Sequence, residues 1–386
     1  MRNPSLLFAS ALLSLVVIFT PPSNHAWWYM WLKFVNTTDI SVKDELLGEK
    51  NPSERGKESF SRNNTKIFSV KSFASLDHSG QKTDQSEMYI RLDDAKRYLP
   101  IQTLVDSRNG TIQITLNENV FKLTRDIPVY EENGLYAPLT APPIMAEGDV
   151  WLPVSFIEET FGQVLQIKGD TASWHVDLAT IPAFSPRLST EKKSVDEMIE
   201  ILSVLRTPID DAHVSTYDSH LPGAARTYRK GVHEGIDWYS YGTGIKIDRF
   251  TPIYSMEQGK VIRADHAYQE MTLTERECLL KTSTANNGKT PDYILDKLRG
   301  RSVWIQYDNG LMARYAHMDR IEGDLEVGDI VKKGERIGYV GNSGTSDGVK
   351  NSARGVHLHL DLFMYGKWFW EDYTFDERKQ ILKSIF

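Results

Sequence analysis

The sequence predicts a mainly β protein, in which a C-terminal antiparallel sheet with a groove follows a small α+β domain built from a repeat. Beyond Leu221, short apolar stretches alternate with glycine-containing turns, as is typical of antiparallel strands. Upstream, a pattern of strand, short helix and further strands occurs twice. A chain of 386 residues has room for two or three such domains.

The C-terminal strands are predicted from these apolar stretches. They are expected at residues 259–262, 302–307, 311–317, 336–340 and 356–363. A sheet with one open face would form a groove that accepts an extended chain.

The repeat lies between residues 88 and 178. The first copy predicts a strand at 88–92, a helix at 93–99 and a strand at 111–114. The second predicts a strand at 150–154, a helix at 155–161 and strands near 164–167 and 172–176.

Two histidines, His357 and His359, carry the strongest functional signal. Alternate residues of a strand point to the same side, so one imidazole can hold a metal ion while the other moves protons. His233 and Asp237 lie four positions apart, and His317 lies between the two pairs. A catalytic zinc site needs three nitrogen or oxygen ligands and an open position, so these five residues suffice for metal binding and proton transfer.

Other histidines and the nearby glycines have plainer interpretations. Isolated histidines such as His175 and His266 are expected at the surface or hydrogen-bonded in the core. The glycine-rich run at 341–348 predicts either the floor of a groove or an ordinary hairpin loop.

The region from about residue 231 to 363 resembles the lysostaphin-type (glycyl-glycine endopeptidase) zinc metallopeptidases, which cut peptide bonds in bacterial peptidoglycan. The family's motifs occur in order: His-x-x-x-Asp at 233–237, Tyr-Ala-His at 315–317, a Gly-Asp-x-Val-like segment at 328–338, and His-x-His at 357–359. The resemblance implies a Zn²⁺ ion held by His233, Asp237 and His359, with His317 and His357 as the catalytic pair. It also implies peptidoglycan peptides as the substrate.

The implied roles agree with the chemistry of these side chains. Zinc held by two neutral imidazoles and one carboxylate can lower the pKa of its water to about 7. His357 would accept a proton and pass it to the leaving amine, and a protonated or hydrogen-bonding His317 would stabilise the oxyanion. No cysteine or serine nucleophile is required.

Two functions remain open at this point. One is a zinc-dependent endopeptidase that hydrolyses cell-wall peptidoglycan. The alternative is a catalytically silent scaffold of the same fold that binds the cell wall or acts in morphogenesis. The bond that would be cut is not encoded in any motif.

The sequence departs from the family pattern near residues 266–300, where a polar, charged segment is inserted. A short helix is expected at 291–298, with its proline in the first turn. The insertion is either a surface excursion or a segment that restricts access to the groove.

The repeat region, at about 89–177, resembles the N-terminal domain of copper amine oxidases. It contains no cluster of metal-binding residues, so neither copper nor oxidase chemistry is expected. A spacer or a wall-contacting domain is expected instead.

The N-terminal segment predicts export. An apolar run at 6–19 follows Arg2, and the aromatic stretch at 27–32 would suit a membrane interface. We therefore expect a signal peptide or membrane anchor at 1–35, with the protein extracytoplasmic and either anchored or secreted to the wall. A flexible polar stalk is expected at 36–87.

The remaining sequence features concern the linker and its helix, the single cysteine and the net charge. Residues 179–220 predict a linker and then a helix to about Arg206, which opens with a capping box at Ser194 and Glu197; the peptidase-like domain is expected at 221–386. The single cysteine, Cys278, excludes an internal disulfide framework. A net charge of -7 gives no sign of nucleic-acid binding, and the oligomeric state is not encoded in any pattern.

Overall fold

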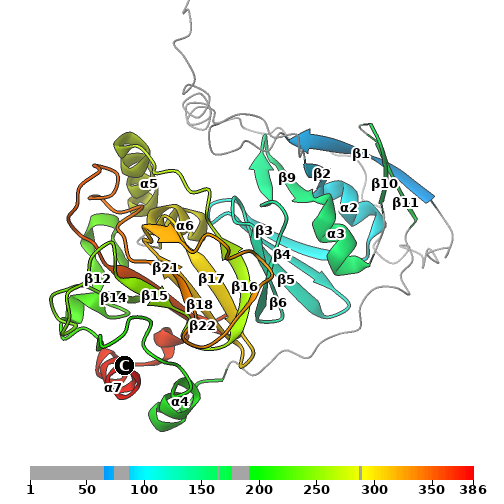
Figure 1. The fold of residues 1–386 in the computed structure, drawn as a ribbon. Coiled ribbons are helices and arrows are strands. Elements are labelled where there is room, and N and C mark those ends of the chain that lie inside the picture. The colour runs from blue at the N-terminus through cyan, green and yellow to red at the C-terminus, as the bar shows by residue number, and fades with distance from the viewer. Residues whose placement is uncertain (1–64, 74–86, 163–164, 170, 176–190, 287–288) are drawn as a thin grey trace, which may run out of the picture. The chain divides into compact units, whose positions relative to one another are not determined.

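The computed structural model describes residues 65–73, 87–162, 165–169, 171–175, 191–286 and 289–386 (Figure 1). The expected signal or anchor segment at 1–35 lies outside the described residues, as do residues 179–190 of the expected linker. Within the described part of the chain, no helix has the length and apolar character needed to cross a membrane.

The N-terminal α+β region contains the predicted repeat. Its first copy gives β2 (Glu87–Arg91) and α2 (Leu92–Tyr98), and its second gives β9 (Asp149–Pro153) and α3 (Val154–Phe161). A six-stranded sheet in the order β10-β11-β1-β2-β9-β8 joins both copies, and it includes β8 (Ile144–Ala146), β10 (Leu165–Lys168) and β11 (Thr171–His175). The predicted repeat is therefore confirmed.

A second sheet includes the predicted strand of the first copy at 111–114, which lies within β4 (Thr111–Leu116). It is antiparallel and contains β3 (Gln102–Asp106), β4, β5 (Asn119–Thr124), β6 (Val129–Glu132) and β7 (Leu135–Pro138). In β4 and β5, buried residues alternate with more exposed ones, so one face supplies the core of this region.

The predicted stalk at 36–87 is wrong for residues 65–73. These residues form β1 (Thr65–Phe73), which pairs with β11 on one side and with β2 on the other. Val70 is buried there. The polar composition of the whole segment hid a short stretch that is stabilised by pairing with strands distant in sequence.

The C-terminal domain is built on an antiparallel six-stranded sheet in the order β14-β22-β18-β17-β16-β20. Its strands are β14 (Ile236–Trp238), β16 (Gly259–Ala264), β17 (Val303–Tyr307), β18 (Leu311–Ala316), β20 (Ile330–Val331) and β22 (Leu358–Met364). A three-stranded sheet contains β15 (Pro252–Tyr254), β19 (Arg320–Ile321) and β21 (Arg336–Tyr339), and a short pair contains β12 (Ala225–Arg226) and β13 (Gly231–Val232). All five predicted C-terminal strands are present.

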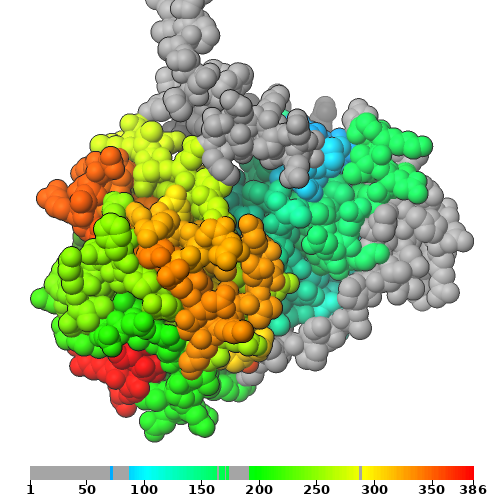
Figure 2. Space-filling model, in the orientation of Figure 1, coloured from blue at the N-terminus to red at the C-terminus, as the bar shows by residue number. Residues whose placement is uncertain are grey.

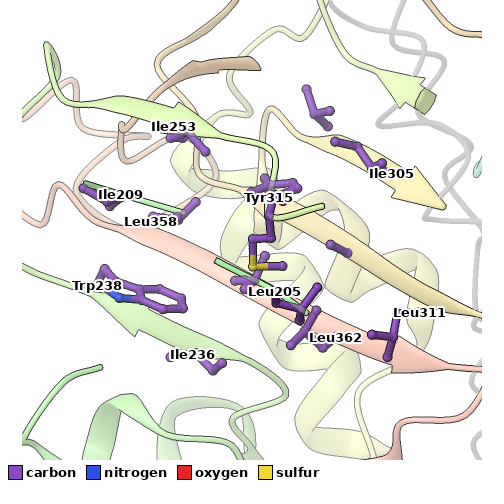
Figure 3. Close-up of a cluster of buried hydrophobic side chains, with 14 of the residues drawn as sticks. Leu205, Ile209, Ile236, Trp238, Ile253, Ile305, Leu311, Tyr315, Leu358 and Leu362 are labelled. Carbon is purple, nitrogen blue, oxygen red and sulfur yellow. Dashed lines mark hydrogen bonds between the residues drawn. The ribbon is translucent and has the colours of Figure 1, made fainter. Parts of the chain in front are cut away.

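The two faces of this sheet differ in character. Leu358, Leu360 and Leu362 of β22 are fully buried in the apolar core, and Figure 3 shows the first and last of them among its side chains. Ile236 and Trp238 of β14 enter the same core. Because side chains alternate along a strand, the intervening residues of β14 and β22 point to the opposite face.

Helices and short 3₁₀ turns complete the domain. The predicted capping box at Ser194 and Glu197 is confirmed and opens α4 (Val195–Leu202), which ends four residues before the expected Arg206. α4 lies beside the C-terminal helix α7 (Phe375–Ile385), as the green and red segments in Figures 1 and 2 show. The 3₁₀ turns are η3 (Asp218–His220), η4 (Thr227–Arg229) and η5 (Phe369–Asp372).

The insertion contains two helices, α5 (Leu273–Ala285) and α6 (Asp292–Arg299). α6 matches the predicted helix, with Pro291 at its N-cap position. Ile294 of α6 is fully buried. The second helix of the insertion is thus packed into the domain.

Candidate metal centre

Strand pairing brings the three predicted metal ligands together. β14 and β22 pair so that Asp237 lies directly opposite His359. His233 precedes β14 and is fixed by its own N–H, which donates to the carbonyl of Ala224 at 2.7 Å. All three side chains are buried.

The ligand atoms fit a zinc ion. Nε2 of His233 lies 3.0 Å from Oδ1 of Asp237 and 3.1 Å from Nδ1 of His359, and the last two atoms are 2.9 Å apart. Ligands about 2.1 Å from a tetrahedral zinc ion are themselves roughly 3.4 Å apart, so a small adjustment would accommodate the metal. Among the described residues, this is the group of histidine and acidic side chains that converges closely enough to hold an ion.

Hydrogen bonds on the far side of each imidazole orient its lone pair towards the centre. Nδ1 of His233 lies 3.2 Å from the carbonyl oxygen of Leu221, and Nε2 of His359 lies 2.9 Å from Oδ1 of Asp361. Both neighbours are acceptors, so these nitrogens carry the protons. The opposite nitrogens are left unprotonated at the centre, which is the arrangement of histidines that bind metals.

Asp361 is the buried anion behind His359. Arg299 donates to both of its carboxylate oxygens, with Nη2 to Oδ1 at 2.9 Å, and Nε of Arg314 lies 3.3 Å from Oδ2. Burial opposes ionisation, but the charges of Arg299, His359 and Arg314 hold the pKa of Asp361 well below its usual range. A permanent negative charge therefore faces the Nε2–H group of His359.

His317 and His357 line the same site. Their ring centroids are 4.7 Å apart, and Nε2 of His357 lies 3.7 Å from Oδ1 of Asp237. Nδ1 of His317 donates to the carbonyl of Ser343 at 2.7 Å, and Nδ1 of His357 donates to that of Gly355 at 2.8 Å. Each neutral ring thus keeps Nε2 as a proton acceptor.

Burial shifts both of these histidines towards the neutral form. It lowers the pKa of His357 to about 4, and it lowers the pKa of His317 well below the usual value, with a further contribution from the charge on His357. A neutral His317 accepts a hydrogen bond through Nε2. Its predicted role in stabilising an oxyanion therefore belongs to its protonated form.

The end of the insertion holds His317 in place. The backbone of His317 has a φ of 60°, in the left-handed region, which costs a non-glycine residue about 1–3 kcal/mol. Its N–H donates to the carbonyl of Arg299 at 2.8 Å. Arg299 therefore acts on both sides of the site, through its backbone on His317 and through its side chain on Asp361.

A groove of about 630 Å³ contains the centre. All five predicted site residues line it. Thr345, Ser346 and Asp347 also line it, so the glycine-rich run forms part of a groove wall. The insertion contributes Arg276, Leu280, Leu295 and Leu298, so it forms part of the groove wall.

The sequence motifs did not identify several residues of the site. Tyr239 stacks on His357 with ring centroids 4.1 Å apart and an interplanar angle of 10°. Nη2 of Arg226 donates to Oδ2 of Asp237 at 3.0 Å. Tyr239 and Asp361 each lie two residues after a metal ligand, so strand alternation alone could have indicated them.

Comparison with known families agrees with this geometry. Residues 238–369 match peptidase family M23. The C-terminal part of the chain is a peptidase family M23 domain. The match includes His317, His357 and His359, and it begins one residue after Asp237. Residues 81–176 match the copper amine oxidase N-terminal domain, which confirms the second resemblance.

Solved structures of low sequence identity were also found. Csd3 from Helicobacter pylori is 15% identical over 79% of this chain and 49% of its own, with a TM-score of 0.26. The catalytic domain of lysostaphin from Staphylococcus simulans is 16% identical over 48% and 92%, with a TM-score of 0.25. A zinc-containing peptidase from Vibrio cholerae is 14% identical over 78% and 77%, with a TM-score of 0.27.

The chain spans about half the length of the Csd3 structure that it matches. No curated protein matches the sequence.

Proposed function

We propose that the M23 domain is a zinc-dependent endopeptidase that hydrolyses peptide bonds in bacterial cell-wall peptidoglycan. The convergence of His233, Asp237 and His359 within about 3 Å of one another carries this proposal. Two buried histidines with proton-accepting nitrogens lie beside these ligands. The match to a peptidase family supports the reaction class.

The protein's residues would divide the reaction between them. A zinc ion held by the three ligands would supply Lewis acidity that lowers the pKa of a water molecule to about 7. Nε2 of His357 accepts the proton released as water attacks the peptide carbonyl, and then delivers it to the leaving amine. The stacked ring of Tyr239 keeps His357 in the required orientation.

The setting of the enzyme forms part of the proposal. A groove along the sheet suits an extended peptide, such as the peptides of peptidoglycan. Cell-wall peptidoglycan lies outside the cytoplasm, so the enzyme would act there. The apolar N-terminal segment would serve either as a membrane anchor or as a signal for secretion to the wall.

Zinc analysis followed by digestion of purified cell walls tests the proposal. We expect about one zinc ion per chain and the release of peptide fragments, whose masses would identify the bond that is cut. A zinc-loaded protein that binds walls without releasing fragments would instead support the scaffold alternative.

A further inference from the structure

Four arginines line the groove, and three of them are already neutralised. Arg226 donates to Asp237 at 3.0 Å. Arg229 holds both oxygens of Glu234, at 2.9 and 2.6 Å. Arg299 holds both oxygens of Asp361.

The fourth arginine, Arg276 of α5, differs from the other three. Its Nε donates to the carbonyl of Gly344 at 3.3 Å, and no described carboxylate lies within 4.0 Å of its guanidinium. The side chain is half-buried, and burial lowers the pKa of Arg276, although a guanidinium stays charged at any physiological pH. Arg276 lines the groove, and the hydrogen bond to Gly344 uses Nε, so its two terminal NH₂ groups keep hydrogen-bonding capacity to spare.

The acid whose charge acts on Arg276 is otherwise engaged. Glu270 accepts from the hydroxyl of Tyr268 at 2.7 Å and from the N–H of Gly344 at 3.0 Å. Tyr228 of η4 also lies close enough to affect the pKa of Arg276. Neither group forms an ion pair with Arg276.

Apolar side chains of the insertion line the same groove. Leu280 lies four residues after Arg276, on the same side of α5, and Leu295 and Leu298 of α6 also line the groove. A partly dehydrated cation beside leucines favours an anionic group carried on an aliphatic body. A planar guanidinium with two free NH₂ groups matches a carboxylate, which it binds with two parallel hydrogen bonds.

We propose that Arg276 binds a free carboxylate of the substrate peptide, so that the insertion selects acidic stem peptides over neutral ones. This inference deepens the proposed function and rests on it. The carboxylate has two sources in such a peptide, the α-carboxylate of a γ-linked glutamate and the C-terminal carboxylate.

The test uses the full-length, zinc-loaded protein and one defined substrate. Its substrate is a dimer of two L-alanyl-γ-D-glutamyl-L-lysyl-D-alanine stems joined by a D-alanyl-lysine cross-link. Three forms are compared: all carboxylates free, the glutamate carboxylates amidated, and the C-terminal carboxylate amidated. In the wild type, amidation of the recognised carboxylate should lower kcat/KM by roughly 10- to 100-fold, mainly through KM.

Variants of α5 test whether Arg276 causes this preference for a free carboxylate. On the peptide with free carboxylates, the kcat/KM of Arg276→Gln should fall below that of the wild type by the same factor. The variant should no longer distinguish this peptide from the amidated form. Arg276→Lys should keep part of the preference, because it keeps the charge without the planar fork. Lys281→Gln removes an exposed cation from the same helix and should change nothing.

Two outcomes would overturn the inference. One is a wild-type kcat/KM that does not change on amidation. The other is an Arg276→Gln variant whose kcat/KM falls by the same factor on free and amidated peptides. If the zinc-loaded wild type cuts none of the peptides, the proposed function fails. Fluorescence anisotropy with labelled peptides then decides the role of Arg276. A preference for the free carboxylate that disappears in Arg276→Gln supports it, and the absence of any preference refutes it.

Discussion

The N-terminal α+β region and the M23 domain both fold around apolar cores, but they bury different polar groups. The N-terminal region buries mainly uncharged ones, such as Asn119 and Asn133, which hydrogen-bond to each other at 2.8 Å. The M23 domain buries histidines, aspartates and arginines around one face of its main sheet. Buried charge is costly unless it is paired, so its concentration there marks the domain that carries the chemistry.

The contrast recurs within one strand. In β22, Leu358, Leu360 and Leu362 complete the apolar core, whereas His359 and Asp361 point to the polar face. A shift of one residue in the pairing of β22 would exchange these two sets. The same residues that stabilise the sheet therefore determine where the ligands lie.

Removal of a metal ligand should have the largest effect. His233→Ala or Asp237→Ala leaves two protein ligands, so we expect the zinc content to fall from about one ion per chain to near zero, with hydrolysis lost. Elemental analysis after gel filtration measures this. His266→Ala is the matched control, because its imidazole is exposed and donates a hydrogen bond to the carbonyl of Leu325. Full zinc occupancy in either ligand variant would refute the assignment.

Removal of a proton-transfer residue should abolish turnover without loss of the metal. His357→Ala should keep zinc and lose about 100- to 10,000-fold in kcat, the range for a missing general acid or base. His317→Ala should behave similarly, because it removes a second proton-accepting nitrogen from the groove. Rates are compared at equal zinc occupancy on one peptidoglycan substrate. Loss of zinc from His357→Ala would show that the roles of His357 and His359 had been exchanged.

Neutralising Asp361 should have an intermediate effect. Asp361→Asn removes the charge that faces Nε2 of His359, leaves Arg314 without this counter-ion, and leaves Arg299 with Glu234 alone at 3.6 Å. We expect zinc affinity to fall about 10- to 100-fold, as for other groups that orient a ligand. Competition with a chromophoric chelator measures the affinity. Asp372→Asn, which affects an ion pair with Lys367 elsewhere in the domain, is the control, and equal affinities in both variants would remove Asp361 from the site.

Local patterns predicted much of the architecture. The strands around His317 and His359 followed from alternation, and the start of α4 followed from the capping box at Ser194. The five ligand and proton-transfer candidates line one groove, and their roles stay a prediction. The predicted strands and the predicted start of α4 succeeded because each rests on residues close together in the sequence.

Other features depend on contacts between distant residues. β1 was missed because its stability comes from β11, which lies about a hundred residues away. Arg299 was missed as part of the site because its partner, Asp361, lies 62 positions later. No local pattern distinguishes a buried arginine of this kind from a solvated one at the end of a helix.

Damage to the N-terminal core should have the smallest effect on the metal centre. Phe121 is 2% exposed and packs edge-on against Phe156 and Phe161, with ring centroids 6.0 and 5.6 Å apart. Phe121→Ala should lower the free energy of unfolding by about 3–5 kcal/mol, because it removes a buried ring and leaves a cavity. Urea denaturation followed by circular dichroism measures this change.

Zinc content and the rate of hydrolysis, measured on the folded Phe121→Ala variant, should equal those of the wild type. This outcome would show that the two regions divide stability and chemistry as their buried groups indicate. A loss of zinc from the folded variant would mean that the N-terminal region also shapes the metal centre. The contrast would then describe where charges are buried without separating the functions of the two regions.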